Sequence, residues 1–153
     1  MDKKIAHAFI KELAKDRENL HKHHSSSRPF SKDYEYVGLL GEFYFSLLFK
    51  LPFDLVKRPS GDRGVDFKLN KFTIDVKTYR KPYNLLHEKD KKHADILVLA
   101  GYKDDTIKFY GWEYAKEMLK CPAKDFGYGV VNHYKHASKL HNMEELKKLL
   151  NKK

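Results

Sequence analysis

The sequence contains a single cysteine, Cys121, among 153 residues. One cysteine excludes a disulfide within the chain and a zinc site built on several thiolates. No stretch approaches the roughly 20 apolar residues of a membrane-spanning helix. The first residues are charged throughout, unlike a secretory signal. Internal repeats and low-complexity tracts are also absent. We therefore expect one cytoplasmic domain (in the host-cell cytoplasm for a viral protein) with no membrane partner.

Positive charge is the most prominent feature of the composition. The chain has 31 Lys and Arg residues against 21 Asp and Glu residues, so its formal net charge is +10. Its isoelectric point is near 9.5 and its mean hydropathy is −0.71. A surplus of that size on a small domain favours a polyanionic partner such as DNA. General solubility, or a basic tail at each end, is the alternative explanation.

Apolar periodicity and turn residues predict alternating helices and strands. An amphipathic helix over 2–20 is followed by a polar connector, 21–30, and by a second helix over 31–50 with Ser31 or Asp33 as its N-cap. The segment 81–92 is basic and predicted to be irregular. The remaining predictions are strands at 53–58, 64–69, 72–79, 95–100, 106–110 and 128–134, and helices at 112–120 and 143–150.

This order predicts an α/β or α+β fold with one central mixed sheet flanked by helices. The continuous apolar run at 95–100 is typical of a central strand covered on both faces. We expect a single domain over 1–153, in which 1–30 adds an extra N-terminal helix and connector to a core formed by 31–153.

The stretch GVDFKLNKFTIDVKTYR, residues 64–80, predicts a β-hairpin with Asn70-Lys71 as its two-residue turn. That turn sets apolar pairs on one face, which packs on the core: Leu69–Phe72, Phe67–Ile74 and Val65–Val76. The pairs on the other face are then Lys68–Thr73, Asp66–Asp75 and Gly64–Lys77.

Two aspartates therefore come directly opposite each other. Like charges at opposed positions are destabilising, and a divalent cation such as Mg²⁺, with Mn²⁺ as a substitute, removes the conflict because carboxylate oxygens are its preferred ligands. Lys77 lies two residues beyond Asp75 on the same face. A further acid, Glu42, is the only charged residue between Glu35 and Lys50, in a helix that is apolar almost all round and hence buried.

A glutamate on a first helix, an aspartate at the end of a strand and Asp-x-Lys on the next strand resemble the PD-(D/E)xK nuclease superfamily. The resemblance covers about residues 31–112, and the "PD" dipeptide is here Val65-Asp66. It is nearest to small phage or archaeal endonucleases and Holliday-junction resolvases. The resemblance implies a restriction-endonuclease-like fold and Mg²⁺-dependent hydrolysis of DNA phosphodiesters. In that scheme Glu42, Asp66 and Asp75 hold one or two metal ions, and Lys77 orients or activates the attacking water.

Several alternatives stay open at this point. Asp/Glu-x-Lys occurs five times in the chain, so the tripeptide alone has little weight. The acids can also be exposed residues of an edge hairpin, and the protein a non-catalytic nucleic-acid-binding module or an RNase of the same fold. Histidines in NHYKHASKLHN leave room for zinc or HNH chemistry, and a homodimer is compatible with the family. The residues expected to contact DNA are Arg63, Tyr79, Arg80, Lys81, Lys91 and Lys92.

Overall fold

The structure is a computed structural model that describes residues 3–20, 34–51, 66–89, 94–127 and 129–151. Its elements, in chain order, are α1 (Lys3–Leu20), α2 (Tyr34–Leu48), β1 (Phe67–Leu69), β2 (Phe72–Tyr79), β3 (Asn84–Glu88), β4 (Ile96–Lys103), β5 (Thr106–Tyr114), α3 (Ala115–Met118), β6 (Ala123–Asp125), β7 (Val131–His136), the 3₁₀ turn η1 (Ala137–Lys139) and α4 (Met143–Leu150). No helix in these ranges is both long and apolar enough to cross a membrane.

The strands form two sheets. The main sheet has the order β1-β2-β4-β5, in which β2 and β4 run parallel and the other two neighbouring pairs run antiparallel. The small sheet has the order β3-β7-β6 and is antiparallel throughout. The fold is therefore mixed α/β with a mixed sheet flanked by helices, as predicted. The expectation of one sheet was wrong, because the small sheet was missed.

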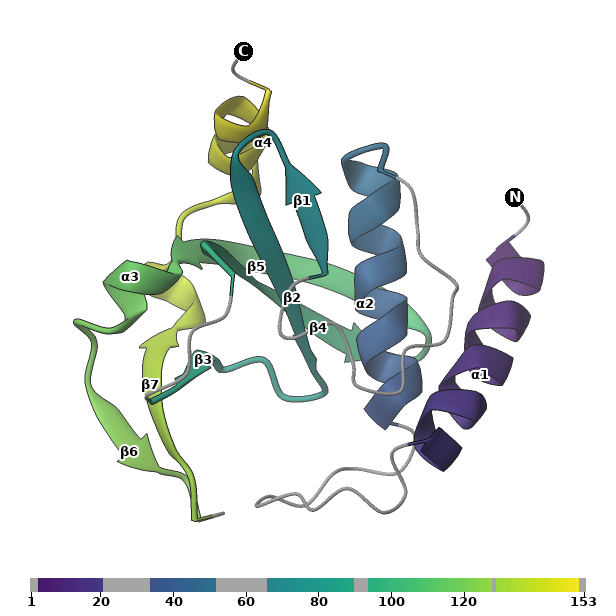
Figure 1. Cartoon of the computed structure of the whole chain (residues 1–153), viewed down its shortest axis with the longest axis horizontal. Coiled ribbons are helices and arrows are strands. Elements are labelled where there is room, and N and C mark those ends of the chain that lie inside the picture. The colour runs from purple at the N-terminus through teal and green to yellow at the C-terminus, as the bar shows by residue number, and fades with distance from the viewer. Residues whose placement is uncertain (1–2, 21–33, 52–65, 90–93, 128, 152–153) are drawn as a thin grey trace.

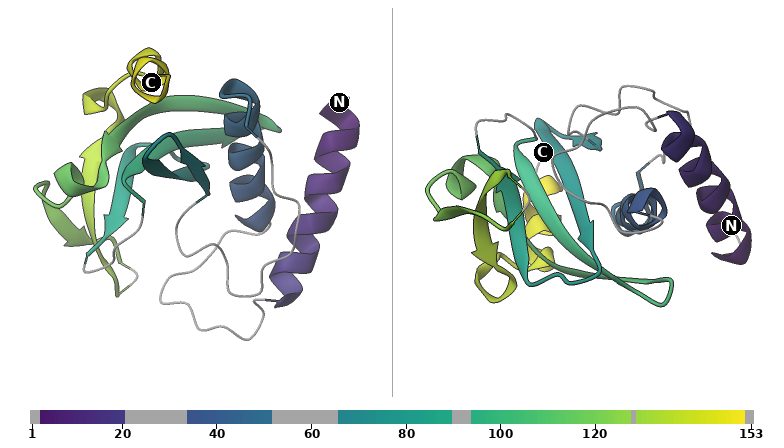
Figure 2. Two further views of the ribbon diagram at one scale, coloured as in Figure 1. Left: turned by 45° about the horizontal axis from the view of Figure 1, so that its top comes forward. Right: turned by 90° about the horizontal axis from the view of Figure 1, so that it is seen from below.

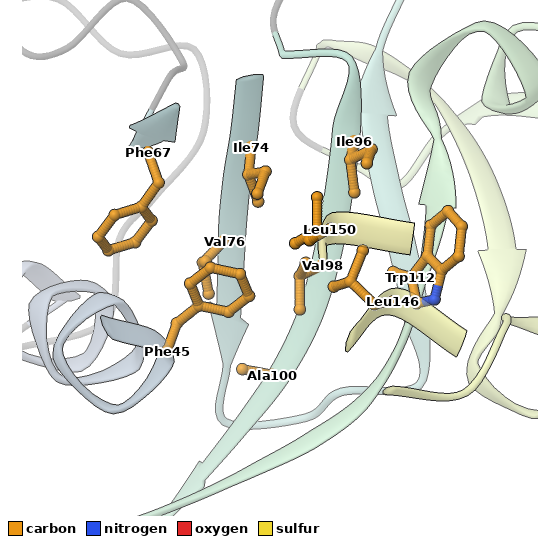
Figure 3. Close-up of a cluster of buried hydrophobic side chains, with 10 residues drawn as sticks. All are labelled: Phe45, Phe67, Ile74, Val76, Ile96, Val98, Ala100, Trp112, Leu146 and Leu150. Atoms are coloured by element: carbon orange, nitrogen blue, oxygen red, sulfur yellow. The ribbon is translucent and has the colours of Figure 1, made fainter. Parts of the chain in front are cut away.

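Helices cover one face of the main sheet. Figure 3 shows Phe45 from α2 and the two leucines Leu146 and Leu150 from α4 against a row of strand side chains that includes Val76 and Val98. Helix α1 packs on α2, so α2 lies between α1 and the sheet (Figures 1 and 2). This face is apolar because even-numbered residues of β2 and β4 point toward it.

The small sheet and α3 cover the opposite face of the main sheet. Leu85 of β3 and Met118 of α3 pack there against Leu97 and Leu99 of β4. Strand β4 is thus buried on both faces, which confirms the prediction made from its continuous apolar run. We call this the inner face of the main sheet, and it carries the odd-numbered residues of β2 and β4.

Element boundaries show where sequence patterns were ambiguous. The helices at the two ends and the strand 72–79 were predicted within one residue of their observed bounds. The predicted helix at 112–120 was wrong in its first half, because β5 continues to Tyr114 and α3 is only Ala115–Met118. The segment 81–92 is not irregular throughout, since it contains β3. The strand expected at 53–58 and the N-caps Ser31 and Asp33 lie outside the described residues.

Candidate active site

The β1–β2 hairpin has the predicted register over its three observed pairs, but the predicted Asp66–Asp75 pair is not among them, and Gly64 and Val65 lie outside the described residues. The turn is Asn70-Lys71, with Asn70 at a φ of 60°, and the Phe67–Ile74, Lys68–Thr73 and Leu69–Phe72 pairs are observed. One residue before Phe67, the Asp66 amide donates a hydrogen bond to the Ile74 carbonyl at 2.9 Å. The Asp66 carboxylate in turn accepts a 2.7 Å hydrogen bond from the backbone N–H of Val76. Asp66 is therefore held against the stretch of β2 that contains Asp75.

Asp75 is a buried acid on an interior strand. Only 5% of the residue is exposed, and the Lys77 ammonium lies 2.7 Å from its Oδ2 atom. Both side chains project from the inner face. The contact compensates charge but is not aligned as a hydrogen bond, and Asp75 Oδ2 has no hydrogen-bond partner in the described part of the chain. The alternative of an exposed acid on an edge hairpin is thus wrong for Asp75.

The electrostatic surroundings keep Lys77 protonated. Burial on its own lowers the pKa of the ammonium. The negative charge of Asp75 outweighs that effect, with further contributions from Tyr79, from the close side-chain contact with Asp75 and from Asp66, and raises the pKa above its ordinary value. At neutral pH Lys77 is therefore a cation and a hydrogen-bond donor. The contribution of Asp66 also shows that the second aspartate is close enough to act on the same ammonium.

Glu42 approaches β2 from the other side. Helix α2 packs on the face opposite Asp75, and a Cβ atom on Gly41 would lie 1.9 Å from Oγ1 of Thr78, so only glycine permits this close packing. The adjacent Glu42 is half-buried, next to the end of β2 but not on the strand face that carries Asp75 and Lys77. Its place in the site, as a third ligand beside the edge of β2, stays a prediction.

The predicted DNA-binding residues are only partly described. Tyr79 continues the inner face beyond Lys77 and is half-buried against the apolar cluster there. Arg80 points to the helical face, where its guanidinium lies 4.8 Å from the centre of the Tyr102 ring. Lys81 is exposed. Arg63, Lys91 and Lys92 lie outside the described residues.

The donor set can be tested against a divalent cation. Within the described ranges, no three carboxylate, imidazole or thiol side chains come together closely enough to hold a metal ion. Mg²⁺, however, is commonly bound through one or two carboxylates, with waters in the remaining positions. Asp66, directly before β1, and Asp75 of β2 supply that pair, and among the described residues no hydrogen bond reaches the buried Asp75 Oδ2. The two aspartates therefore fit Mg²⁺ or Mn²⁺ without a third protein ligand.

A second buried acid, Glu113 of β5, was missed by the sequence analysis. Its residue is 2% exposed, and its carboxylate accepts hydrogen bonds from the Lys135 ammonium, from His141 at 3.2 Å and from the Tyr114 amide at 2.9 Å. The sequence did contain a sign of this buried acid, because Glu113 is the only charged residue in the apolar run FYGWEYA. It was overlooked because the helix predicted over 112–120 made Glu113 an ordinary first-turn acid.

The histidines do not form a metal centre in the described part of the chain. His133 Nδ1 lies 2.9 Å from the Cys121 carbonyl, and His136 Nδ1 lies 2.8 Å from the Ser138 hydroxyl. His141 pairs with Glu113, so each of the three has a separate partner. His21, His23 and His24 lie outside the described residues.

Comparisons with known proteins gave no match: no family model, no curated protein and no solved structure is similar to this chain.

Proposed function

We propose that the protein is a Mg²⁺-dependent nuclease that hydrolyses DNA phosphodiester bonds as an endonuclease, with a core of the restriction-endonuclease-like kind. One observation carries the proposal: a buried aspartate, a lysine two residues later on the same strand face, and a second aspartate held against that strand by the hairpin. The resemblance of Glu42, Asp66, Asp75 and Lys77 to the PD-(D/E)xK pattern supports it. The net charge of +10 supports a polyanionic substrate.

The aspartates and the lysine have different proposed roles. Asp66 and Asp75 would hold the metal, which when bound lowers the pKa of a water and offsets the charge that develops on the phosphate. Lys77, held in its charged form, donates a hydrogen bond to a non-bridging phosphate oxygen or to the attacking water. Two clustered carboxylates repel a phosphate backbone, so they would weaken a module that only binds nucleic acid. This favours the catalytic alternative.

Cleavage of DNA by matched variants tests the proposal. Wild-type protein should nick or cut plasmid, branched or single-stranded DNA in Mg²⁺ and not in EDTA. Asp75→Asn keeps the size of the side chain but removes its charge, and should reduce the rate by at least about 100-fold. Lys77→Met should do the same. The control is Lys68→Ala, because Lys68 lies on the same hairpin, is exposed and ends Asp66-Phe67-Lys68, another of the five Asp/Glu-x-Lys tripeptides in the chain.

Folding must be separated from catalysis, because Lys77→Met leaves Asp75 buried without its cation. The double variant Asp75→Asn/Lys77→Met removes both charges, and its thermal melting shows whether the hairpin still folds. Cleavage at the wild-type rate by a folded Asp75→Asn protein would exclude this site. Cleavage of RNA but not of DNA would contradict the DNA substrate and favour an RNase of the same fold.

A further inference from the structure

The inner face of the main sheet continues past Lys77 onto an exposed aromatic surface. Tyr79, two residues beyond Lys77, pairs with Gly101 of β4, and Gly101 pairs with Lys108 of β5. Residues paired in this way project from the same face. The rings of Tyr110 and Pro82 cover Gly101 on that face: a Cβ atom there would lie 2.7 Å from Tyr110 Cε2 and 2.8 Å from Pro82 Cγ.

A β-bulge gives Tyr110 its position. Leu99 pairs with Gly111, whereas the next residue, Ala100, pairs with Phe109, so Tyr110 is the extra residue of β5. A bulge of this kind bends its strand and re-aims a side chain. In a regular strand, Phe109 and Tyr110 would point to opposite faces of the sheet, and each would pair with a residue of β4. Instead, Tyr110 extends over the bare backbone of Gly101, which supports its ring from below.

The exposed part of this surface combines an aromatic ring with a cation. Tyr110 is 39% exposed, and the Lys108 ammonium lies 5.0 Å from the centre of its ring. Tyr83 follows Pro82 directly and, at 64%, is the most exposed large hydrophobic residue of the part that the structure describes. We name Pro82, Lys108 and Tyr110 the stacking platform.

An aromatic ring beside a lysine is suited to unpaired nucleotides. A base stacks on the ring irrespective of its sequence, and the cation neutralises the adjoining phosphate. Bases in an intact duplex are already stacked on each other and do not expose their faces to a side chain. From Lys77 the platform is about 7 Å along the strand and about 10 Å across two strands. That separation corresponds to only a few nucleotides of a single strand.

We propose that the stacking platform binds an unpaired base of a nucleic acid, so that the preferred substrate contains a single-stranded segment beside the scissile phosphate. The placement of the cut rests on the proposed nuclease function, whereas the binding does not require metal or catalysis. Charge complementarity and continuity with the strand face that carries Asp75 and Lys77 both favour this occupant.

Binding without metal tests the platform independently of cleavage. Fluorescence anisotropy in EDTA compares a short single-stranded oligonucleotide with a blunt duplex of the same sequence. Tyr110→Ala should weaken single-strand binding by about 10-fold and duplex binding by less than about 2-fold. Tyr110→Phe, which keeps the ring, should bind as the wild type. A 2-aminopurine in the single strand should lose fluorescence on binding to wild type and regain it with Tyr110→Ala.

Two further variants make the result specific. Phe126→Ala is the matched control, because Lys124 lies 4.5 Å from that ring on the separate β6–β7 hairpin, and it should leave the affinity unchanged. Lys108→Ala should lower the salt slope of single-strand binding by about 0.7. Equal losses on duplex and single strand, or no loss with Tyr110→Ala, would overturn the platform even if the protein cleaves DNA. If single-strand binding depends on the Tyr110 ring but the protein cleaves no nucleic acid, the platform proposal stands and the nuclease proposal is wrong.

Discussion

The main sheet carries two buried acids at neighbouring cross-strand positions, and they differ in their hydrogen-bond partners. Asp75 of β2 pairs with Leu97 of β4, and Leu97 pairs with Glu113 of β5, so both carboxylates project from the inner face on either side of one leucine. Each has a lysine partner. Glu113 accepts hydrogen bonds from Lys135, His141 and the Tyr114 amide, whereas Asp75 Oδ2 has the charge of Lys77 beside it but no hydrogen bond from the residues that the structure describes.

This difference separates a structural acid from a candidate functional one. Partners of Glu113 come from β7 and from the segment before α4, so the acid ties three parts of the chain together. The lysine of Asp75 comes from the same strand, two residues away, and therefore joins no distant elements. A buried carboxylate that costs stability without linking elements is expected to serve ligand binding or chemistry.

The largest expected effect is on stability. Glu113→Ala leaves Lys135 without its partner and removes three hydrogen bonds, so it should lower the free energy of unfolding by about 3 kcal/mol. On a domain of this size that corresponds to a decrease in Tm of about 6–12 °C. Asp75→Asn also takes the counter-charge of Lys77 away, but the side chain keeps its volume and Asp66 still acts on that ammonium, so the loss should be smaller, about 1–2 kcal/mol. Chemical denaturation of both variants measures the two values.

Partial rescue sharpens that result. The double variant Glu113→Leu/Lys135→Met replaces the ion pair by apolar groups and should recover stability relative to Glu113→Ala, since no charge is left unpaired. A loss of stability with Asp75→Asn as large as that with Glu113→Ala would contradict the division between the two acids.

The contrast also shows which features the sequence could predict. The hairpin register followed from local pattern, because a shift of one residue would turn Phe67 and Ile74 to the wrong face. Asp75 and Lys77 come together through the alternation of β2 alone, because they are two residues apart on one strand. Glu113 meets Lys135 and His141 across 22 and 28 residues. Lys135 belongs to the small sheet, whose strand β6 (Ala-Lys-Asp) has no apolar pattern to reveal it, and His141 reaches Glu113 through a single bridge to β5.

Glu42 lies between these two cases. Its lone charge in an apolar helix predicted a buried carboxylate, whereas Glu42 is half-buried, and the pattern could not specify which face of the sheet α2 would cover. The stacking platform could not be predicted for a similar reason. A bulge changes how two strands pair, and the apolar–polar alternation of a single strand does not reveal it.

Metal binding should give an intermediate effect. Because Mg²⁺ or Mn²⁺ would bind only the folded form, a concentration tenfold above Kd should stabilise the protein by about 1.4 kcal/mol, or a rise in Tm of about 3–6 °C. Asp66→Asn and Asp75→Asn should reduce that rise, and Glu113→Gln, which lies outside the proposed ligand pair, should retain it. Thermal melting with and without metal measures each shift. An equal rise in all three variants would place the metal elsewhere.

The smallest expected effect is the pH dependence of stability that Glu113 contributes. Burial raises the pKa of this carboxyl, but the hydrogen bonds from Lys135 and Tyr114, together with the charge of His141, outweigh burial and lower the pKa below its ordinary value. A lowered pKa contributes stability that is present above the pKa of the unfolded chain and is lost as pH falls through the folded value. The Tm of the wild type should therefore run parallel to that of Glu113→Gln above about pH 6 and fall more steeply as the pH drops from about 5 through the folded pKa. The control is Glu117→Gln, because the ion pair of Glu117 with Lys120 lies at the surface, and it should follow the wild-type curve. Curves for the wild type and Glu113→Gln that stay parallel below about pH 5 would show that the acid is not held in its charged form by its partners.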